Sequence, residues 1–186
     1  MRDGGLMNRV LGPFDCCPWT AGSGRAAVQR RAALRGAPLY SVEERRRRDA
    51  TGWTLVQGVL APVQFAVFLV SLALVVRTLL TGEGGEAATA SVVLKTLVLY
   101  AIMVTGAIWE KAVFGRYLFA PAFFWEDVFS MLVLGLHTAY LTALTFGWGE
   151  ERSQLLLALA AYVAYVINAA QFVLKLRLAR LGAAHG

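Results

Sequence analysis

The amino-acid sequence predicts an all-α integral membrane protein, a bundle of four transmembrane helices with both termini in the cytoplasm. Four apolar stretches lie at about 53–80, 91–109, 125–146 and 153–176, and each approaches or exceeds the roughly 20 residues that cross a bilayer. Of the 186 residues, 58 % are hydrophobic and 16 % are charged, whereas soluble domains contain about 25 % charged residues. The helices of a soluble bundle would also show polar outer faces, which these stretches largely lack.

Residues 1–38 mix Gly, Arg, Ala, Pro and Ser without lasting periodicity, and we expect a disordered basic extension there. It has no apolar segment typical of a cleavable signal peptide, and part of it is a candidate for a misassigned translation start. Its two cysteines, Cys16 and Cys17, are adjacent and therefore predict neither a disulfide framework nor a zinc site.

Ordered structure is expected to begin in the segment "PLYSVEERRRRDATGW". Ser41 is followed three residues later by Glu44, which is the spacing of a capping box. This pair predicts a helix that starts after Pro38 and leads into the first membrane span. The membrane domain is therefore expected over 39–181, with a short tail at 182–186.

The loop charges predict the orientation. Ten of the eighteen Lys and Arg residues precede residue 49, and Lys111 and Arg116 lie between the second and third stretches. The other two loops, "TGEGGEAATA" and "GWGEER", are poor in basic residues. The positive-inside rule then places both termini and the 110–124 loop in the cytoplasm. The net charge of +6 is thus a topology signal, and we expect no nucleic-acid partner.

The third stretch contains unusual polar residues for a membrane helix. At about 100° per residue, Glu126, Ser130, Val133 and His137 share one face, and Glu126 and His137 are separated by roughly 16 Å along the axis. Ionisable residues inside a membrane usually face a bundle interior or a cavity. His137 is a candidate ligand-binding residue, or it forms a structural hydrogen bond with Asn168 or Gln171. Lys95 is expected near the outer end of the second helix, where its side chain can reach the interface.

The connection between the second and third stretches, "IWEKAVFGRYLFAPAFFWED", combines acids, bases and aromatics. Such a segment can hold a flat aromatic ligand and pair its carboxylate. Alternatively, Lys111 and Arg116 are only orientation markers and the aromatic side chains only mark the membrane interface. No nucleotide loop, catalytic Ser or Cys arrangement or haem-attachment motif is present in the sequence.

Two segments, "RRDATGWTLVQGVLAPVQF" and "IWEKAVFGRYLFAPAFFWEDVFSMLVLGLHTAYL", resemble the 3-vinyl bacteriochlorophyllide hydratases of photosynthetic bacteria (2-vinyl in older naming). The resemblance covers roughly Leu39 to Leu176. It implies a lyase of bacteriochlorophyll biosynthesis in the inner, photosynthetic membrane, which hydrates the 3-vinyl group of chlorophyllide a or bacteriochlorophyllide a to 3-(1-hydroxyethyl). It also implies no resident cofactor, because water is the co-substrate and magnesium enters as part of the pigment.

The resemblance gives the candidate residues roles. Desolvation and an adjacent like charge both favour a protonated carboxyl group, so Glu126 with Asp127 is expected to hold a proton for the vinyl carbon, with Glu110 as a reserve acid. His137 is a candidate axial ligand of the pigment magnesium, or a base for the water. Lys111 or Arg116 would pair the propionate. The aromatic wall is expected from Phe124 and Trp125.

Two other function classes compete with the hydratase. A non-catalytic pigment-binding or assembly protein would use the same histidine and aromatics without turnover. A small transporter subunit would show inverted repeats or several charges at mid-membrane, which the sequence lacks. Because the pigment is large for a small bundle, a homo-oligomer or another pigment-biosynthesis enzyme is a possible partner beside the lipid bilayer.

Overall fold

The computed structural model describes residues 40–183, and every regular element there is an α-helix. Four helices are long and apolar enough to cross a membrane: α4 (Trp53–Thr81), α5 (Gly85–Phe114), α6 (Phe124–Phe146) and α7 (Glu151–Ala183). The predicted all-α class with four candidate spans is confirmed. Residues 1–39 and 184–186, which include the expected basic extension, lie outside the described residues.

A short helix, α3 (Val42–Ala50), precedes the first span. The predicted capping box is present: the Ser41 hydroxyl accepts a hydrogen bond from the Glu44 N–H at 3.2 Å, and the Glu44 carboxylate accepts one from the Ser41 N–H at 2.8 Å. These bonds hold the pKa of Glu44 below its ordinary value. The helix ends at Ala50, with Thr51 as its C-cap, and the Thr54 hydroxyl donates to the Arg48 carbonyl at 2.6 Å, which ties α3 to the start of α4.

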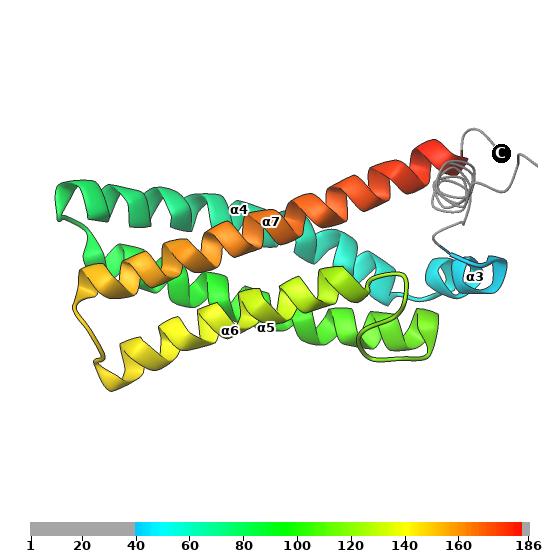
Figure 1. Ribbon diagram of the computed structural model, residues 1–186, viewed down its shortest axis with the longest axis horizontal. Helices are drawn as coiled ribbons and strands as arrows, with labels where there is room; N and C mark the ends of the chain where they lie inside the picture. The colour runs from blue at the N-terminus through cyan, green and yellow to red at the C-terminus, as the bar shows by residue number, and fades with distance from the viewer. Residues whose placement is uncertain (1–39, 184–186) are drawn as a thin grey trace, which may run out of the picture. The chain divides into compact units, whose positions relative to one another are not determined.

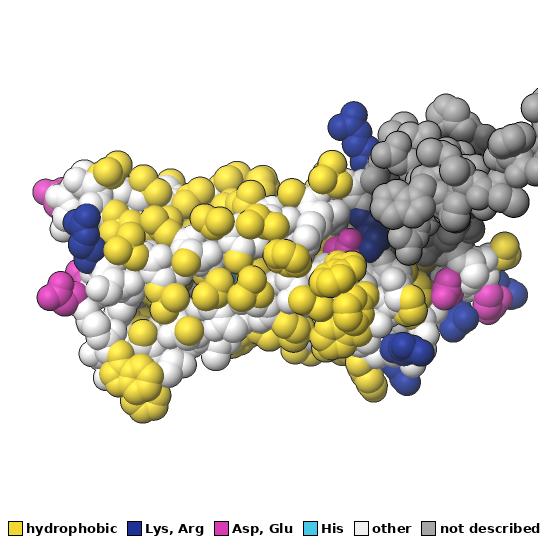
Figure 2. All heavy atoms as spheres, viewed as in Figure 1, with side chains coloured by type: hydrophobic (Ala, Val, Ile, Leu, Met, Phe, Trp, Pro, Cys, Tyr) yellow, Lys and Arg dark blue, Asp and Glu magenta, His cyan; other side chains and the backbone are white. Residues whose placement is uncertain are grey.

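The four long helices alternate in direction (Figure 1). The α4–α5 and α6–α7 turns lie at one end of the helices, and α3 and the connection between α5 and α6 lie at the other, which we call the α3 end. The α4–α5 turn is short because Gly82 and Gly84 adopt φ of 75° and 83°, a conformation that glycine reaches without steric cost. Figure 2 shows hydrophobic side chains along the length of the helices and charged side chains toward their ends.

Two apolar clusters fill the interior. One joins all four long helices and includes Val92, Tyr140 and Tyr162; the other contains Leu99, Val133 and Ala164. The closest backbone approach is between α4 and α5, whereas α6 and α7 meet the other helices mainly through long side chains.

Buried polar groups cross-link these helices. The Ser71 hydroxyl on α4 lies 2.7 Å from the Ser91 hydroxyl on α5 and 2.6 Å from the Tyr162 hydroxyl on α7. Near the α3 end, the Trp109 indole donates to the Thr54 hydroxyl at 3.0 Å. Hydrogen bonds of this kind satisfy polar groups for which lipid offers no partner.

The Ser71–Tyr162 bond is expected to stabilise the fold measurably. In a double-mutant cycle with Ser71→Ala and Tyr162→Phe, we expect a coupling free energy of about 0.6 kcal/mol, because interhelical hydrogen bonds in membrane proteins average that value. The measurement is unfolding of the purified protein by denaturing detergent. Ser153→Ala, at an exposed serine, should combine additively with Tyr162→Phe. Additive Ser71 and Tyr162 effects would contradict the expectation.

Candidate active site

Two buried carboxyl groups meet at the α3 end. Glu110 comes from the last turns of α5 and Asp127 from the first turn of α6, and their side chains are 6 % and 5 % exposed. The two groups lie within hydrogen-bonding reach of each other. Carboxyl groups in such contact cannot both be ionised without strong repulsion, so the arrangement favours one shared proton.

The connection between α5 and α6 folds back to hold this pair. The Phe119 N–H donates to Asp127 Oδ2 at 2.7 Å, and the Ala120 N–H donates to Glu110 Oε2 at 3.3 Å. Phe119 has a φ of 59°, an uncommon conformation for a bulky residue. The backbone is therefore shaped so that its N–H groups point at both acids.

Glu126 faces a different helix from Asp127. Its Oε2 accepts a hydrogen bond from Lys175 Nζ on α7 at 2.6 Å in an ion pair. Adjacent helical residues point about 100° apart, so Asp127 reaches α5 while Glu126 reaches α7. The sequence suggested Glu126 with Asp127 as the proton-sharing pair; the structure brings Asp127 together with the reserve acid Glu110.

An aromatic cluster lies beside the carboxyl groups, and Phe123 is at its centre. The Phe123 ring is 5.9 Å from the rings of Trp109 and Phe172, 5.8 Å from Phe114 and 6.3 Å from Tyr40. These side chains belong to α5, α7 and the residue before the α3 cap, so the cluster joins the helices at this end. Sequence reasoning did not single it out as the aromatic wall.

The other predicted binding residues lie at the surface. Phe124 and Trp125 are 44 % and 67 % exposed, and their rings pack edge to face with centres 5.5 Å apart. Lys111 and Arg116 are also exposed. Lys111 Nζ donates to the Gly115 carbonyl at 3.0 Å, which caps the end of α5.

His137 is fully buried, as the predicted stripe on α6 requires. Its Nδ1 lies 2.8 Å from the Val133 carbonyl, whereas its Nε2 has no hydrogen-bond partner among residues 40–183. Because a carbonyl oxygen only accepts, Nδ1 must donate, and the neutral imidazole then presents a free lone pair at Nε2. The structural alternative, a bond to Asn168 or Gln171, is not formed: His137 bonds the Val133 carbonyl instead, and the Asn168 amide donates to Ser130 Oγ at 2.8 Å.

The expectation for Lys95 is wrong. Its side chain is fully buried, and Nζ lies 3.8 Å from the centre of the Tyr165 ring, with no hydrogen-bond partner in the part of the chain that the structure describes. The physical reason is the start of the helix: α5 begins at Gly85, and the ten residues before Lys95 place it roughly 15 Å inside the helix. That depth and its inward face keep the ammonium from the interface.

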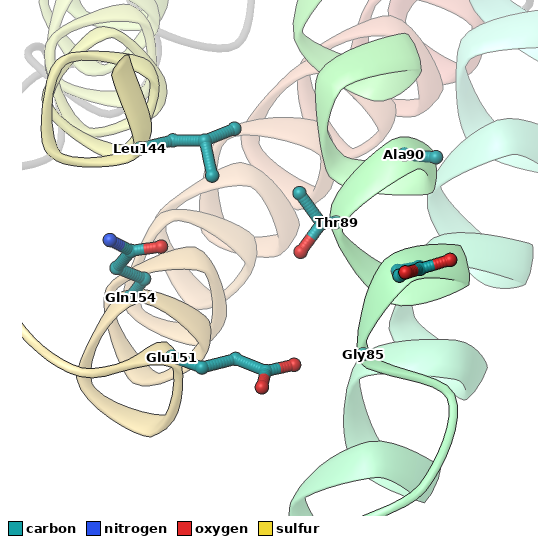
Figure 3. A pocket seen from close by; sticks show the side chains of 7 residues that line it. Gly85, Thr89, Ala90, Leu144, Glu151 and Gln154 are labelled. Carbon is teal, nitrogen blue, oxygen red and sulfur yellow. The ribbon is translucent and has the colours of Figure 1, made fainter. Parts of the chain in front are cut away.

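An open pocket of about 580 Å³ lies at the opposite end from the carboxyl pair. Figure 3 shows Thr89 on α5 and Glu151 on α7 facing the same space, with Leu144 of α6 and Gln154 nearby. Its lining contains two acids and no aromatic side chain. This chemistry does not suit a large aromatic ligand, so the carboxyl pair and His137 remain the candidate site.

Comparison with known proteins gives one consistent family. The sequence model of the 2-vinyl bacteriochlorophyllide hydratase family matches residues 40–178. A 2-vinyl bacteriochlorophyllide hydratase of Rhodobacter capsulatus is 69 % identical over 146 residues, which cover 78 % of this chain and 85 % of the relative. One from Cereibacter sphaeroides is 67 % identical over 143 residues, covering 77 % and 89 %.

No solved structure matches the chain significantly. The match with the family model nevertheless spans all four candidate membrane helices, the carboxyl pair, the aromatic cluster and His137. The chain belongs to the 2-vinyl bacteriochlorophyllide hydratase family.

Proposed function

We propose that this protein adds water to the 3-vinyl group of chlorophyllide a or bacteriochlorophyllide a and makes the 3-(1-hydroxyethyl) group during bacteriochlorophyll biosynthesis. The relatives are hydratases by name, which favours catalysis over pigment storage. The observation that supports the chemistry is the buried contact between Glu110 and Asp127 beside the Phe123 cluster. It offers a proton donor in a place from which water can be largely excluded.

The reaction needs one proton and one water. The shared proton of the carboxyl pair is delivered to the terminal vinyl carbon, which leaves a cation at the carbon attached to the ring, where the macrocycle delocalises the charge. Water attacks that carbon, and the carboxylate left on the enzyme accepts the proton that water releases. The protein ends the cycle in its starting protonation state. Water is the co-substrate, and we propose no resident cofactor.

Among the acids, the geometry favours Glu110 and Asp127 as the reacting pair. Glu126 is neutralised by Lys175, which makes it a poor proton donor and fits a role in holding α6 against α7. The loop N–H groups on Asp127 and Glu110 would stabilise the carboxylate that remains after proton transfer.

His137 is proposed to bind the pigment magnesium through Nε2. Its ring leans toward Val133, which is the direction of Asp127. The Cα atoms of Asp127 and His137 are roughly 15 Å apart along α6. The length of the imidazole and the width of the macrocycle together bridge this distance, so that the vinyl group can reach the carboxyl pair while His137 binds the magnesium. A base role for His137 is less suited, because its free nitrogen lies deep in the bundle and far from the carboxyl pair.

We also propose the orientation and location. The α3 end contains Arg45–Arg48, Lys111 and Arg116, and the positive-inside rule places that end in the cytoplasm. The carboxyl pair would then lie near the cytoplasmic face of the bacterial inner, photosynthetic membrane, where a pigment without its long alcohol tail can enter. A homo-oligomer or a complex with another pigment enzyme would shield the open side of the site.

Turnover tests the function directly. Membranes containing the full chain and supplied with 3-vinyl chlorophyllide should yield a product heavier by one water and with blue-shifted absorption, because the vinyl conjugation is lost. Absorption and mass spectrometry are the measurements. Bound pigment of unchanged mass on folded protein would support the non-catalytic pigment-binding alternative.

The carboxyl pair is expected to dominate the rate. Asp127→Asn and Glu110→Gln should each lower kcat by about a hundredfold or more, because general acid–base groups contribute at least that much. Glu126→Gln is the matched control at the neighbouring acid and should lose less than about tenfold. Steady-state turnover gives the comparison. The reverse order of effects would restore the Glu126–Asp127 pair suggested by the sequence.

If His137 binds the magnesium, replacing it should weaken the binding of the magnesium pigment but not of the magnesium-free pigment. His137→Leu should raise KM for the magnesium pigment by about tenfold, the effect of losing roughly 1.4 kcal/mol of binding, and leave KM for the magnesium-free pigment nearly unchanged. Parallel titrations of the two pigments measure the difference. An equal loss for both would show that His137 serves packing instead.

A further inference from the structure

Lys95 is a buried charge that the proposed mechanism does not use. Its side chain has no exposed surface, and Nζ has no hydrogen-bond partner among the described residues. No ion pair there includes it, and its contact is the face of the Tyr165 ring. A ring face offsets only part of the cost of burying an ammonium group. Such a residue inside a membrane bundle is a candidate ligand-binding group.

Lys95 and His137 lie at a similar depth. On α5, Lys95 falls between Val92 and Leu99; on α6, His137 falls between Val133 and Tyr140. Val92 and Tyr140 belong to one apolar cluster, and Leu99 and Val133 to the other. The two polar side chains therefore occupy the layer between the clusters.

The order of the polar groups along the helices is set by the backbone. Lys95 lies fifteen residues before Glu110 on α5, about 22 Å along the axis, and His137 lies ten residues after Asp127 on α6, about 15 Å. From the α3 end, the order of the Cα atoms is therefore the carboxyl pair, then His137, then Lys95.

A chlorophyllide presents matching groups in the same order. Its vinyl-bearing pyrrole and the pyrrole fused to the cyclopentanone ring stand on opposite sides of the magnesium. We infer that Lys95 binds the substrate by donating a hydrogen bond to the ketone oxygen of that cyclopentanone ring. This inference rests on the proposed function, because the vinyl group at the carboxyl pair and magnesium at His137 fix the direction of the ketone.

The packing allows a flat ligand to enter between α5 and α6. Backbone contact between these two helices is sparse compared with that between α4 and α5. At this seam Tyr100 and Thr138 form a hydrogen bond at 2.9 Å and are not buried. Parting α5 from α6 would therefore break few close contacts.

The experiment compares wild type with Lys95→Met in the full chain, and Arg77→Met serves as the control at an exposed basic residue of α4. The substrates are 3-vinyl chlorophyllide a and the same pigment with its ring ketone reduced to an alcohol. We expect Lys95→Met to raise KM for the ketone pigment by about tenfold, because a hydrogen bond to a charged donor is lost, and to leave kcat nearly unchanged. For wild type, KM should rise by a similar factor when the reduced pigment replaces the ketone pigment. For Lys95→Met, KM should be the same for both pigments.

A vibrational measurement reads the bond without turnover. In wild type and Arg77→Met, the ketone stretch of the bound pigment should lie at lower frequency than in aprotic solvent, and Lys95→Met should abolish that shift. If Lys95→Met does not fold, the wild-type shift still decides the point. A shift without hydration would uphold the ketone contact and reject the hydratase function. Hydration without a shift, or a shift retained in Lys95→Met, would overturn the inference.

A third pigment tests whether Lys95 binds the propionate carboxylate of the pigment instead of its ring ketone. With the propionate converted to its methyl ester, Lys95→Met and wild type should differ by the same factor as with the free acid. Loss of that difference would show that Lys95 binds the carboxylate, and the assignment to the ketone would fall.

Discussion

The contact between Glu110 and Asp127 sets the geometry of the α3 end. Two carboxyl groups can lie together in a buried place only if they share a proton and receive hydrogen bonds. The α5–α6 connection supplies those bonds through the N–H groups of Phe119 and Ala120, and this requires the chain to fold back over the helix ends. The rotation of α5 against α6 is fixed at the same time, because each acid must turn toward the other.

That rotation determines which residues meet farther along the bundle. With Asp127 turned to α5, Glu126 turns to α7 and pairs with Lys175, and one turn later Ser130 accepts a bond from Asn168. These contacts hold α6 to α7 near the α3 end. Beyond Ser130 the one remaining polar residue of the stripe is His137, which bonds only the Val133 carbonyl of its own helix among the described residues. The helix is thus cross-linked to α7 near one end, whereas the buried imidazole in its middle makes no hydrogen bond to another described helix.

The architecture was predictable because lipid restricts a chain to long apolar helices. The capping box at Ser41 and the buried face of α6 followed from local spacing alone. The partner of Asp127 could not be predicted from local spacing, because adjacency in sequence favoured Glu126. Only tertiary packing shows which neighbouring helix each acid faces. Lys95 was misplaced because the Gly and Ala residues of 85–90 suggested a loop, and the structure continues α5 through them.

The position of Glu110 and Asp127 at the ends of an antiparallel helix pair was a signal that the sequence did contain. Residues in the last turn of one helix and the first turn of the next approach each other when the connection between them is short. Phe123 was passed over in favour of Phe124 and Trp125 for a similar reason. All three are aromatic neighbours, and only the start of α6 decides which ring turns inward.

The buried polar atoms that lack hydrogen-bond partners affect how much of the protein the cell retains. Each polar group left without a partner costs about 1–3 kcal/mol, and within the described residues Lys95 Nζ, His137 Nε2 and both amide atoms of Gln64 lack one. Any molecule that satisfies them adds its binding free energy to the stability of the folded chain. Empty chains should therefore be the first that membrane proteases remove, and the amount of this protein would follow the supply of its ligand without any change in gene expression.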